Sequence, residues 1–234
     1  MTAFFRFPHT PHLAWLGDGQ PRNDKVLAPH EARELLSHEV VVEEKVDGAN
    51  LGFSADEHGT LRAQNRGAYL NLEGSHGQWK PLKRWLQPRT HELAEALFPD
   101  LMLFGEWCYA VHSIRYIRLP DWFLAFDVYD RARSEFWSAA RRDALAARLG
   151  LAVVPRLGAG KFGLPELRAL LGHSQLTDGP AEGLYVRRDD GERLVARAKL
   201  VQREFVQAID DHWSKKALQT NALGSNVEGE GSWR

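Results

Sequence analysis

The feature that most constrains the fold is a series of short segments that are rich in β-branched and aromatic residues. These segments are separated by residues typical of turns. ANLGFSA and GTLRAQN flank the turn residues DEHG, and GLYVRR and RLVARAKL flank DDGE, so each pair predicts a β-hairpin. Three further segments predict single strands: VVVEE at 40–44, LMLFGEW at 101–107 and WFLAFDVYD at 122–130. Strands therefore dominate the middle of the chain.

Segments with helical character lie around these strands: residues 29–38, 138–150, 165–172 and 202–219. Ser138 is suited to cap the second of them and Gly150 to end it, and the last carries apolar residues near helical spacing. LAVVP at 151–155 predicts one more short strand. Because the strands are central and the helices surround them, we expect an α+β fold.

The chain reads as one domain, because its 234 residues contain no internal repeat, low-complexity tract or Pro/Ser linker. We expect this domain at residues 1–220 and a flexible tail, rich in Gly, Asn and Ser, at 221–234. The one cysteine, Cys108, rules out an internal disulfide and fits a reducing cytoplasm. Neither a signal peptide nor a run of roughly 20 apolar residues is present, so we expect a cytoplasmic protein without a membrane partner.

The net charge of −1 weighs against a large non-specific grip on nucleic acid, because such proteins are often basic overall. Basic residues can still cluster locally. One candidate cluster is Lys80, Lys83, Arg84 and Arg89; another is Arg187, Arg188, Arg193, Arg197, Lys199 and Arg203. Scattered, solvated charge is the alternative interpretation, especially of the first cluster.

The first chemical signal is EKVDGAN at 44–50, where a lysine at the end of an apolar strand comes two residues before an Asp-Gly turn. A K-x-D-G match arises by chance roughly once in twenty chains of this length with average composition. A surface lysine before a hairpin turn would produce the same letters. The motif therefore gains weight only from other motifs farther along the chain.

Further pieces occur downstream in an interpretable order. They are Arg66 in QNRG, FGE at 104–106, FDVYD at 126–130, Glu182-Gly183 at the start of a strand, and Arg197 and Lys199 on the last strand. Because side chains two residues apart on a strand share a face, Arg197 and Lys199 should point to the same side.

This ordered set resembles the covalent nucleotidyltransferase superfamily of ligases and mRNA capping enzymes, and within it the RNA ligase 2 family. The matching motifs are I at 45–48, the downstream arginine at Arg66, III at 104–106, IIIa at 125–130, IV at 182–187 and V at 197–201. Asn50 is typical of that branch, and YAVHSIRYIRLPDWFLAFDVYD resembles its bacterial members. The chain departs from the family at Arg197, where motif V usually has a lysine.

The resemblance implies a nucleotidyltransferase fold in which two antiparallel sheets frame an ATP cleft, without an OB domain. It implies an ATP-dependent RNA ligase: Lys45 takes AMP from ATP, AMP passes to an RNA 5′-phosphate, and a 3′-hydroxyl then displaces it. The implied catalytic residues are Lys45, Asn50, Glu182 and Lys199. The implied ATP-binding residues are Glu44, Lys45, Arg66, Glu106, Phe126, Glu182, Arg197 and Lys199.

Individual roles follow from the same resemblance. Glu106 would bind the ribose, Phe126 would stack on the adenine, and Arg66 would touch the phosphate or ribose. Glu182 would hold Mg²⁺ (or Mn²⁺) through water, and Asn50 would serve the later steps. The expected partners are RNA, in a repair reaction, and a protein that supplies a nucleic-acid-binding domain.

Physical chemistry supports this assignment of Lys45. Attack on a phosphate needs a neutral amine, whereas a lysine with a pKa of about 10.4 is mostly charged at neutral pH. Nearby cations would lower that pKa and would also stabilise the charge that develops on the phosphate. Arg197, Lys199 and a bound metal ion would have this effect, although arginine differs from lysine in shape and does not deprotonate.

Two other functions fit parts of the pattern. A DNA ligase or guanylyltransferase usually carries an OB domain after motif V, but 35 residues follow Lys199, too few for a five-stranded barrel. A non-catalytic RNA-binding module on a degenerate ligase fold would not need Lys45, Glu106, Glu182 and Lys199 intact.

Other motifs have simpler interpretations. GAGKFG at 158–163 matches a dinucleotide-binding fingerprint, but the surrounding βαβ pattern is missing, so we expect a plain loop. Cys108 lacks the His/Asn pattern of a cysteine nucleophile and is expected to be packed. His112 lies between two matched motifs, so it can belong to the margin of the site or to the surface.

Overall fold

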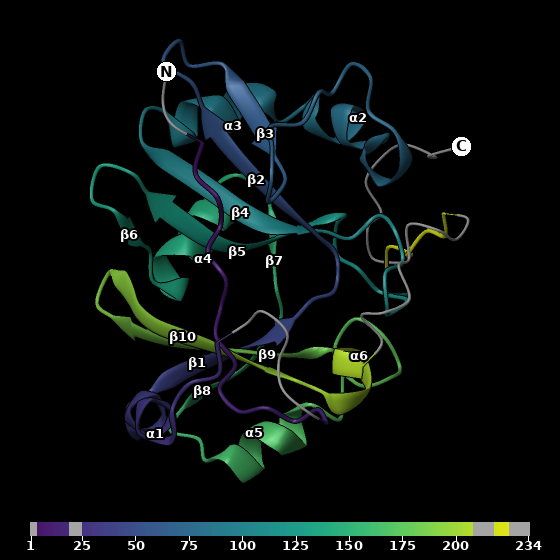
Figure 1. The fold of residues 1–234 in the computed structure, drawn as a ribbon. Helices are drawn as coiled ribbons and strands as arrows, with labels where there is room; N and C mark the ends of the chain where they lie inside the picture. The colour runs from purple at the N-terminus through teal and green to yellow at the C-terminus, as the bar shows by residue number, and fades with distance from the viewer. Residues whose placement is uncertain (1–3, 19–24, 208–217, 225–234) are drawn as a thin grey trace.

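The structure, a computed structural model, describes residues 4–18, 25–207 and 218–224. Figure 1 shows two β-sheets, one above the other, with helices on their outer sides. We call them the upper and the lower sheet, after their places in this view. The chain passes from the lower to the upper sheet at residues 46–48, a segment that we call the crossing turn.

The upper sheet is antiparallel except for one short parallel pair. Its strands follow the order β3 (Leu61–Gln64), β2 (Ala49–Ala55), β4 (Leu101–Trp107), β5 (Phe123–Asp130) and β6 (Glu135–Phe136). β7 (Ala152–Val153) adds to β5 in parallel. The β2–β3 hairpin turns at Asp56, whose Oδ1 accepts the N–H groups of His58 and Thr60 at 2.9 Å each. This hairpin confirms the prediction from DEHG.

The lower sheet is antiparallel throughout, in the order β10 (Arg193–Val201), β9 (Gly183–Asp190), β1 (Val40–Lys45) and β8 (Arg156–Gly160). It confirms the second hairpin. The prediction of a loop at 158–163 was wrong for its first residues, because β8 extends to Gly160. A side chain at Gly158 would lie 2.9 Å from the ring of Phe162, so the close packing of that ring explains the glycine.

Helices pack against the outer face of each sheet. The lower sheet carries α1 (Pro29–Ser37) and α5 (Leu164–Leu170), and the upper sheet carries α2 (Leu82–Leu86), α3 (Thr90–Leu97) and α4 (Ala139–Arg148). A short 3₁₀ turn, η1 (Gly77–Trp79), precedes α2. The predicted cap of α4 is confirmed, because Ser138 Oγ accepts the N–H of Arg141 at 3.4 Å and Gly150 has a φ of 61°.

The core has three parts, two under the helices and one between the sheets. The N-terminal segment contributes to the part between the sheets, since it runs down from the upper to the lower sheet (Figure 1). Phe5 stacks on Tyr129 with 4.0 Å between ring centroids, and Phe7 packs on Phe104 at 5.0 Å. Farther along, Leu13 donates its N–H to the carbonyl of Lys199 in β10 at 2.7 Å. The segment thereby closes one side of the space between the sheets.

Buried ion pairs also connect the two sheets. Arg187 of β9 donates to Asp127 of β5 at 2.6 Å, and both side chains are only 2% exposed. Arg142 of α4 donates to Glu43 of β1 at 2.5 Å and to the carbonyl of Phe126 at 2.7 Å. The sequence suggested that Arg187 and Arg197 belong to one basic cluster. The structure shows instead that both are engaged between the sheets, where they pair with the buried Asp127.

The C-terminal region differs from its prediction. The structure describes the helix α6 over Arg203–Gln207 only, and residues 218–219 are not helical. Ile209 and Trp213, which have helical spacing with Phe205, lie outside the described residues. Residues 221–224, expected in a flexible tail, pair instead with the loop between β4 and β5.

Candidate active site

The candidate site lies between the sheets, where β1 ends and the crossing turn begins. Lys45 is the last residue of β1, and its Nζ donates to both carboxylate oxygens of Glu182 at 2.6 Å. The two side chains are 19% and 13% exposed. Glu182 directly precedes β9, whose Gly183 pairs with Lys45. The structure therefore brings motifs I and IV together as predicted from the sequence.

The surroundings of Lys45 keep its amine protonated. Burial lowers the pKa of Lys45, but the negative charges of Glu182 and Asp47 outweigh burial and raise that pKa above its ordinary value. Burial also raises the pKa of Glu182, against the nearby charges of Lys45 and Lys199. In this state Lys45 is a cation in an ion pair, so it cannot act as a nucleophile until the pair is broken.

The upper sheet supplies the opposite wall. Asn50 in β2 and Glu106 in β4 are direct partners in the sheet register, and Arg66 follows β3. Each has a buried polar atom without a hydrogen-bond partner among the described residues: Asn50 Oδ1, Glu106 Oε2 and Arg66 Nε. Buried polar atoms are rarely left unpaired. These three lie on one wall, where a polar ligand would satisfy them, although other unpaired atoms occur elsewhere among the described residues.

The pKa of Glu106 is also shifted by its surroundings. Burial raises the pKa of Glu106 to about 8, and the neighbouring carboxylates Glu182 and Asp47 act in the same direction, while Lys45 and Arg66 oppose them. A carboxyl group with this pKa is largely protonated at neutral pH, so it can donate one hydrogen bond and accept another. A ribose hydroxyl has the matching capacity.

Two aromatic rings face each other beside this wall. Phe126 of β5 and Tyr185 of β9 are 6.5 Å apart between ring centroids, with 13° between their planes. Two van der Waals contacts with a planar group between the rings would need roughly 7 Å. Tyr185 was not selected from the sequence. It pairs with Lys199 on the neighbouring strand, so the two side chains share a face of the sheet. This pairing register cannot be read from the sequence.

Motif V places Lys199 and Arg197 on one face of β10, as the period of two predicts. Their surroundings differ, however. Lys199 contributes positive charge at Glu182, whereas Arg197 pairs with the buried Asp127 and lies over the rings of Phe7 and Phe136, 4.6 and 4.4 Å from their centroids. The expectation that Arg197 binds ATP phosphates is therefore not supported, because its guanidinium is engaged between the sheets.

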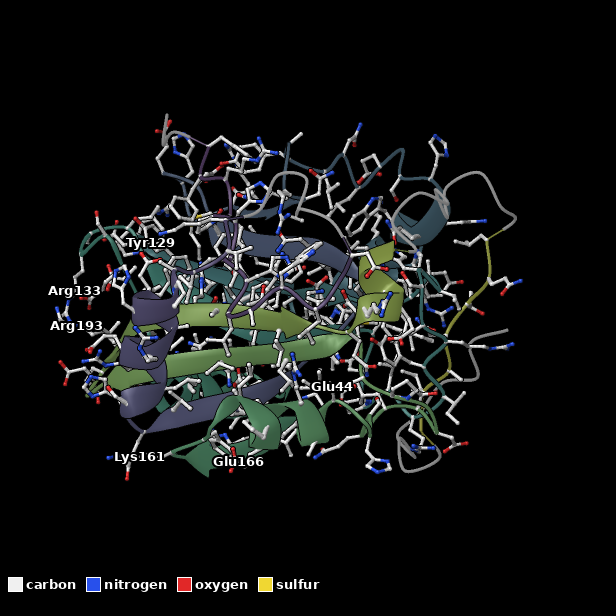
Figure 2. All side chains as sticks on the ribbon, turned by 60° about the horizontal axis from the view of Figure 1, so that its bottom comes forward. Glu44, Tyr129, Arg133, Lys161, Glu166 and Arg193 are labelled. Carbon is white, nitrogen blue, oxygen red and sulfur yellow. The ribbon has the colours of Figure 1, made fainter. Side chains whose placement is uncertain are left out.

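Glu44 also departs from its expected role. It alternates with Lys45 along β1, and its carboxylate accepts the hydroxyl of Ser174 and the N–H of Gln175, at 2.5 and 2.9 Å. Figure 2 shows Glu44 on the α5 side of the lower sheet. Its side chain is therefore turned away from Lys45 and is engaged elsewhere, so the expected contact with ATP is not supported.

The β4–β5 loop (residues 108–122) holds the crossing turn. Asp47 Oδ2 accepts the N–H of Ser113 at 2.6 Å, and the N–H of Asp47 is donated to Tyr116 Oη at 2.7 Å. His112 lies beside this contact, with Nδ1 4.0 Å from Asp47 Oδ1 and Nε2 3.0 Å from Gln78 Oε1. These contacts place His112 at the margin of the site, where burial lowers the pKa of its ring. Cys108 is fully buried, as expected of a packed residue.

The fold and the site together define a class: two sheets that face each other, with a partly buried lysine between them at the end of a strand. The model of the RNA ligase family matches residues 38–201. The chain belongs to the RNA ligase family. Comparison with curated proteins finds no match.

Solved structures of similar fold come from Naegleria gruberi RNA ligase. The structure with PPi is 19% identical, with a TM-score of 0.62 over 90% of this chain and 62% of that one. A variant with AMP and Mn is 18% identical, with a TM-score of 0.62 over 88% of this chain and 58% of that one. A variant without ligand is 20% identical, with a TM-score of 0.57 over 75% and 52%. The chain thus spans a little more than half the length of these structures.

Two features are absent from the described part of the chain. No helix there is long and apolar enough to cross a membrane. The same residues contain no group of three or more His, Cys, Asp or Glu side chains arranged to hold a metal ion.

Proposed function

We propose that this chain is an ATP-dependent RNA ligase that joins RNA 5′-phosphate and 3′-hydroxyl ends through AMP carried on Lys45. The observation that carries the proposal is the partly buried Lys45 amine, which lies opposite a wall with three unsatisfied polar atoms among the described residues. A nucleotide placed between them would satisfy that wall and present its phosphate to the amine. Membership of the RNA ligase family supports the same reaction.

The nucleotide would be held at three points. Phe126 and Tyr185 face each other at a spacing close to that required by an adenine between them. Glu106 would exchange hydrogen bonds with the ribose, because its raised pKa lets it act as donor and acceptor. Arg66, whose Nε has no hydrogen-bond partner among the described residues, would bind the phosphate or ribose.

Transfer of AMP to Lys45 would then be a displacement at the α-phosphorus. The Nζ–P bond forms, the bond from this phosphorus to the bridging oxygen breaks, and pyrophosphate leaves. The amine first gives its proton to solvent, which requires that the ion pair with Glu182 be broken. Lys199 would stabilise negative charge on the phosphate during the displacement.

A metal ion fits this arrangement as a companion of ATP. Mg²⁺ is usually bound by one or two carboxylates, phosphate oxygens and water, so it needs no cluster of protein ligands. Mg²⁺ or Mn²⁺, held by Glu182 through water, would place positive charge near the α-phosphate and favour the neutral form of Lys45.

The later steps would use the same cleft. AMP moves from Lys45 to an RNA 5′-phosphate, and a 3′-hydroxyl then displaces AMP to form the phosphodiester bond. Asn50, beside Glu106 in the sheet, is the residue that we assign to these steps.

We further propose a role in RNA repair in the cytoplasm, where the one buried cysteine would stay reduced. We also propose a partner protein that adds contacts to RNA.

The test is strand joining by the purified chain on matched nicks in RNA, DNA and hybrid duplexes, and on single-stranded ends. Each substrate is supplied with ATP, GTP or NAD. The proposal expects joining of RNA ends with ATP. A chain that seals only DNA ends would be a DNA ligase, and a chain that binds RNA but joins nothing would be a binding module.

A further inference from the structure

Residues 218–224, which we call the clasp, lie along the β4–β5 loop. They form backbone hydrogen bonds with residues near the beginning and near the end of that loop. Five backbone hydrogen bonds between 2.9 and 3.1 Å join Val111 to Gln219, Asn221 to Tyr109, Ala222 to Tyr116, Leu119 to Ala222 and Gly224 to Leu119. The clasp therefore fixes a loop that is far from it in sequence.

Asn221 is the centre of the clasp. Its side chain is buried, and the whole residue is 5% exposed. Its Nδ2 donates to the carbonyls of Cys108 and Ala110 at 2.8 and 3.0 Å, and its Oδ1 accepts the N–H of Tyr116 at 2.8 Å. A short side chain with two donors and one acceptor is needed for this set, which asparagine supplies.

The loop transmits this constraint to the crossing turn. The ring of Tyr116 is fully buried, and its hydroxyl accepts the N–H of Asp47 at 2.7 Å. The carboxylate of Asp47 accepts the N–H groups of Ser113 and Ile114 from the same loop, at 2.6 and 3.3 Å. Asn221, Tyr116 and Asp47 thus form a continuous chain of hydrogen bonds.

The crossing turn sets how Lys45 and the wall formed by the upper sheet face each other. Lys45 ends the lower-sheet strand just before it, and Asn50 lies in the upper-sheet strand just after it. The turn has no room to shift on one side, because a side chain at Gly48 would lie 2.8 Å from the carbonyl oxygen of Trp107. The contacts of Asp47 with the β4–β5 loop restrain the turn further.

We propose that Asn221 is a positioning residue for AMP transfer to Lys45, acting through Tyr116 and Asp47. This inference rests on the proposed function. The clasp holds Lys45 at the right place relative to the wall that binds the nucleotide. Loosening it displaces the amine from the α-phosphate but leaves the base between Phe126 and Tyr185, so the rate falls more than ATP binding does.

The test is single-turnover formation of lysyl-AMP by the full chain, with the rate constant at saturating ATP and the half-saturating ATP concentration measured separately. Asn221→Ala should lower the rate constant about 10- to 100-fold, with a smaller change in half-saturation. Leu218→Ala is the matched control, because Leu218 is in the same segment but 47% exposed. It should label at the wild-type rate.

A double-mutant cycle tests the route. Tyr116→Phe removes only the hydroxyl that holds Asp47, and combined with Asn221→Ala it should slow labelling by much less than the product of the two single effects. Wild-type rates for Asn221→Ala, or fully multiplicative effects, would overturn the proposal. If Asn221→Ala is not recovered folded, Tyr116→Phe decides alone, and a wild-type rate for it is the refuting outcome.

The outcomes also separate this inference from the proposed function. A wild-type chain that takes no label from ATP refutes both. A wild-type chain that labels, with variants that label equally fast, refutes the clasp alone. Hydrogen exchange gives an independent readout: the amide of Asp47 should exchange faster in Asn221→Ala than in Leu218→Ala, and equal protection would contradict the chain of contacts.

Discussion

Replacing Arg197 should reduce stability much more than it reduces the chemical step. Its guanidinium pairs with Asp127, which is 2% exposed, and lies over Phe7 and Phe136. Breaking a buried ion pair costs about 3–5 kcal/mol, but Asp127 would keep Arg187 at 2.6 Å, which reduces that penalty. Each lost cation–π contact adds about 0.5–2 kcal/mol. We therefore expect Arg197→Ala to lower the unfolding free energy by about 3 kcal/mol.

Urea unfolding measures this loss directly. With a slope of about 2–3 kcal/mol per M, the midpoint for Arg197→Ala should fall by about 1–1.5 M. Arg197→Lys keeps the charge but not the planar fork, so its loss should be about half as large. Lys199→Ala is the comparison: it should leave the midpoint nearly unchanged and slow lysyl-AMP formation about a hundredfold. The reasoning is refuted if Arg197→Ala unfolds like wild type and slows labelling as much as Lys199→Ala.

Three further outcomes can be checked with the same assays. Asn50→Ala should form lysyl-AMP normally but seal a pre-adenylylated RNA slowly; the reverse pattern would move Asn50 to ATP binding. ATP should be preferred over NAD and GTP as the donor of the covalent adduct, and equal adenylylation from NAD alone would contradict this. Glu106→Gln should change the pH dependence of stability. The folded-state pKa of Glu106, raised by burial to about 8, lies above its unfolded value, so the folded state holds an extra proton and Glu106 weakens the fold progressively as pH rises between about 4.5 and 8. Relative to wild type, Glu106→Gln should therefore be more stable at about pH 8.5 than at about pH 5, by urea unfolding, and an identical difference at both pH values would argue against the raised pKa.

The strands that carry the site could be predicted from the sequence because their patterns are local. β-Branched and aromatic runs bounded by turn residues located β1, β2, β4, β5, β9 and β10. β8 was missed because its sequence, RLGAG, contains two glycines and lacks a β-branched residue. It is a strand because it pairs with β1 and Phe162 packs over it, and both contacts are tertiary.

The candidate site was predictable to the extent that it lies within motifs. Lys45 and Glu182 meet as expected, and strand alternation correctly placed Lys199 and Arg197 on one face. That alternation could not show that Asp127, on another sheet, engages Arg197. The alternation also indicates that Glu44 points away from Lys45, a consequence that the resemblance alone obscured.

The clasp was the least predictable feature. A polar segment before a Gly-rich end has the composition of a flexible tail. Asn221 is ordered because the carbonyls of Cys108 and Ala110 and the N–H of Tyr116 together match its amide group. Those partners lie more than 100 residues away in the chain, so no local pattern indicates them.

The most direct test of the account is to locate the covalent adduct. The chain is incubated with ATP and Mg²⁺, denatured, digested and analysed by mass spectrometry. The account predicts one adenylyl group on Lys45, none on Lys45→Ala or Lys45→Arg, and normal labelling of Lys161→Ala, which changes an exposed lysine at the edge of the lower sheet (Figure 2). Arginine keeps the charge but cannot supply a neutral amine. AMP on another residue, or labelling of a folded Lys45→Ala variant, would contradict the central claim.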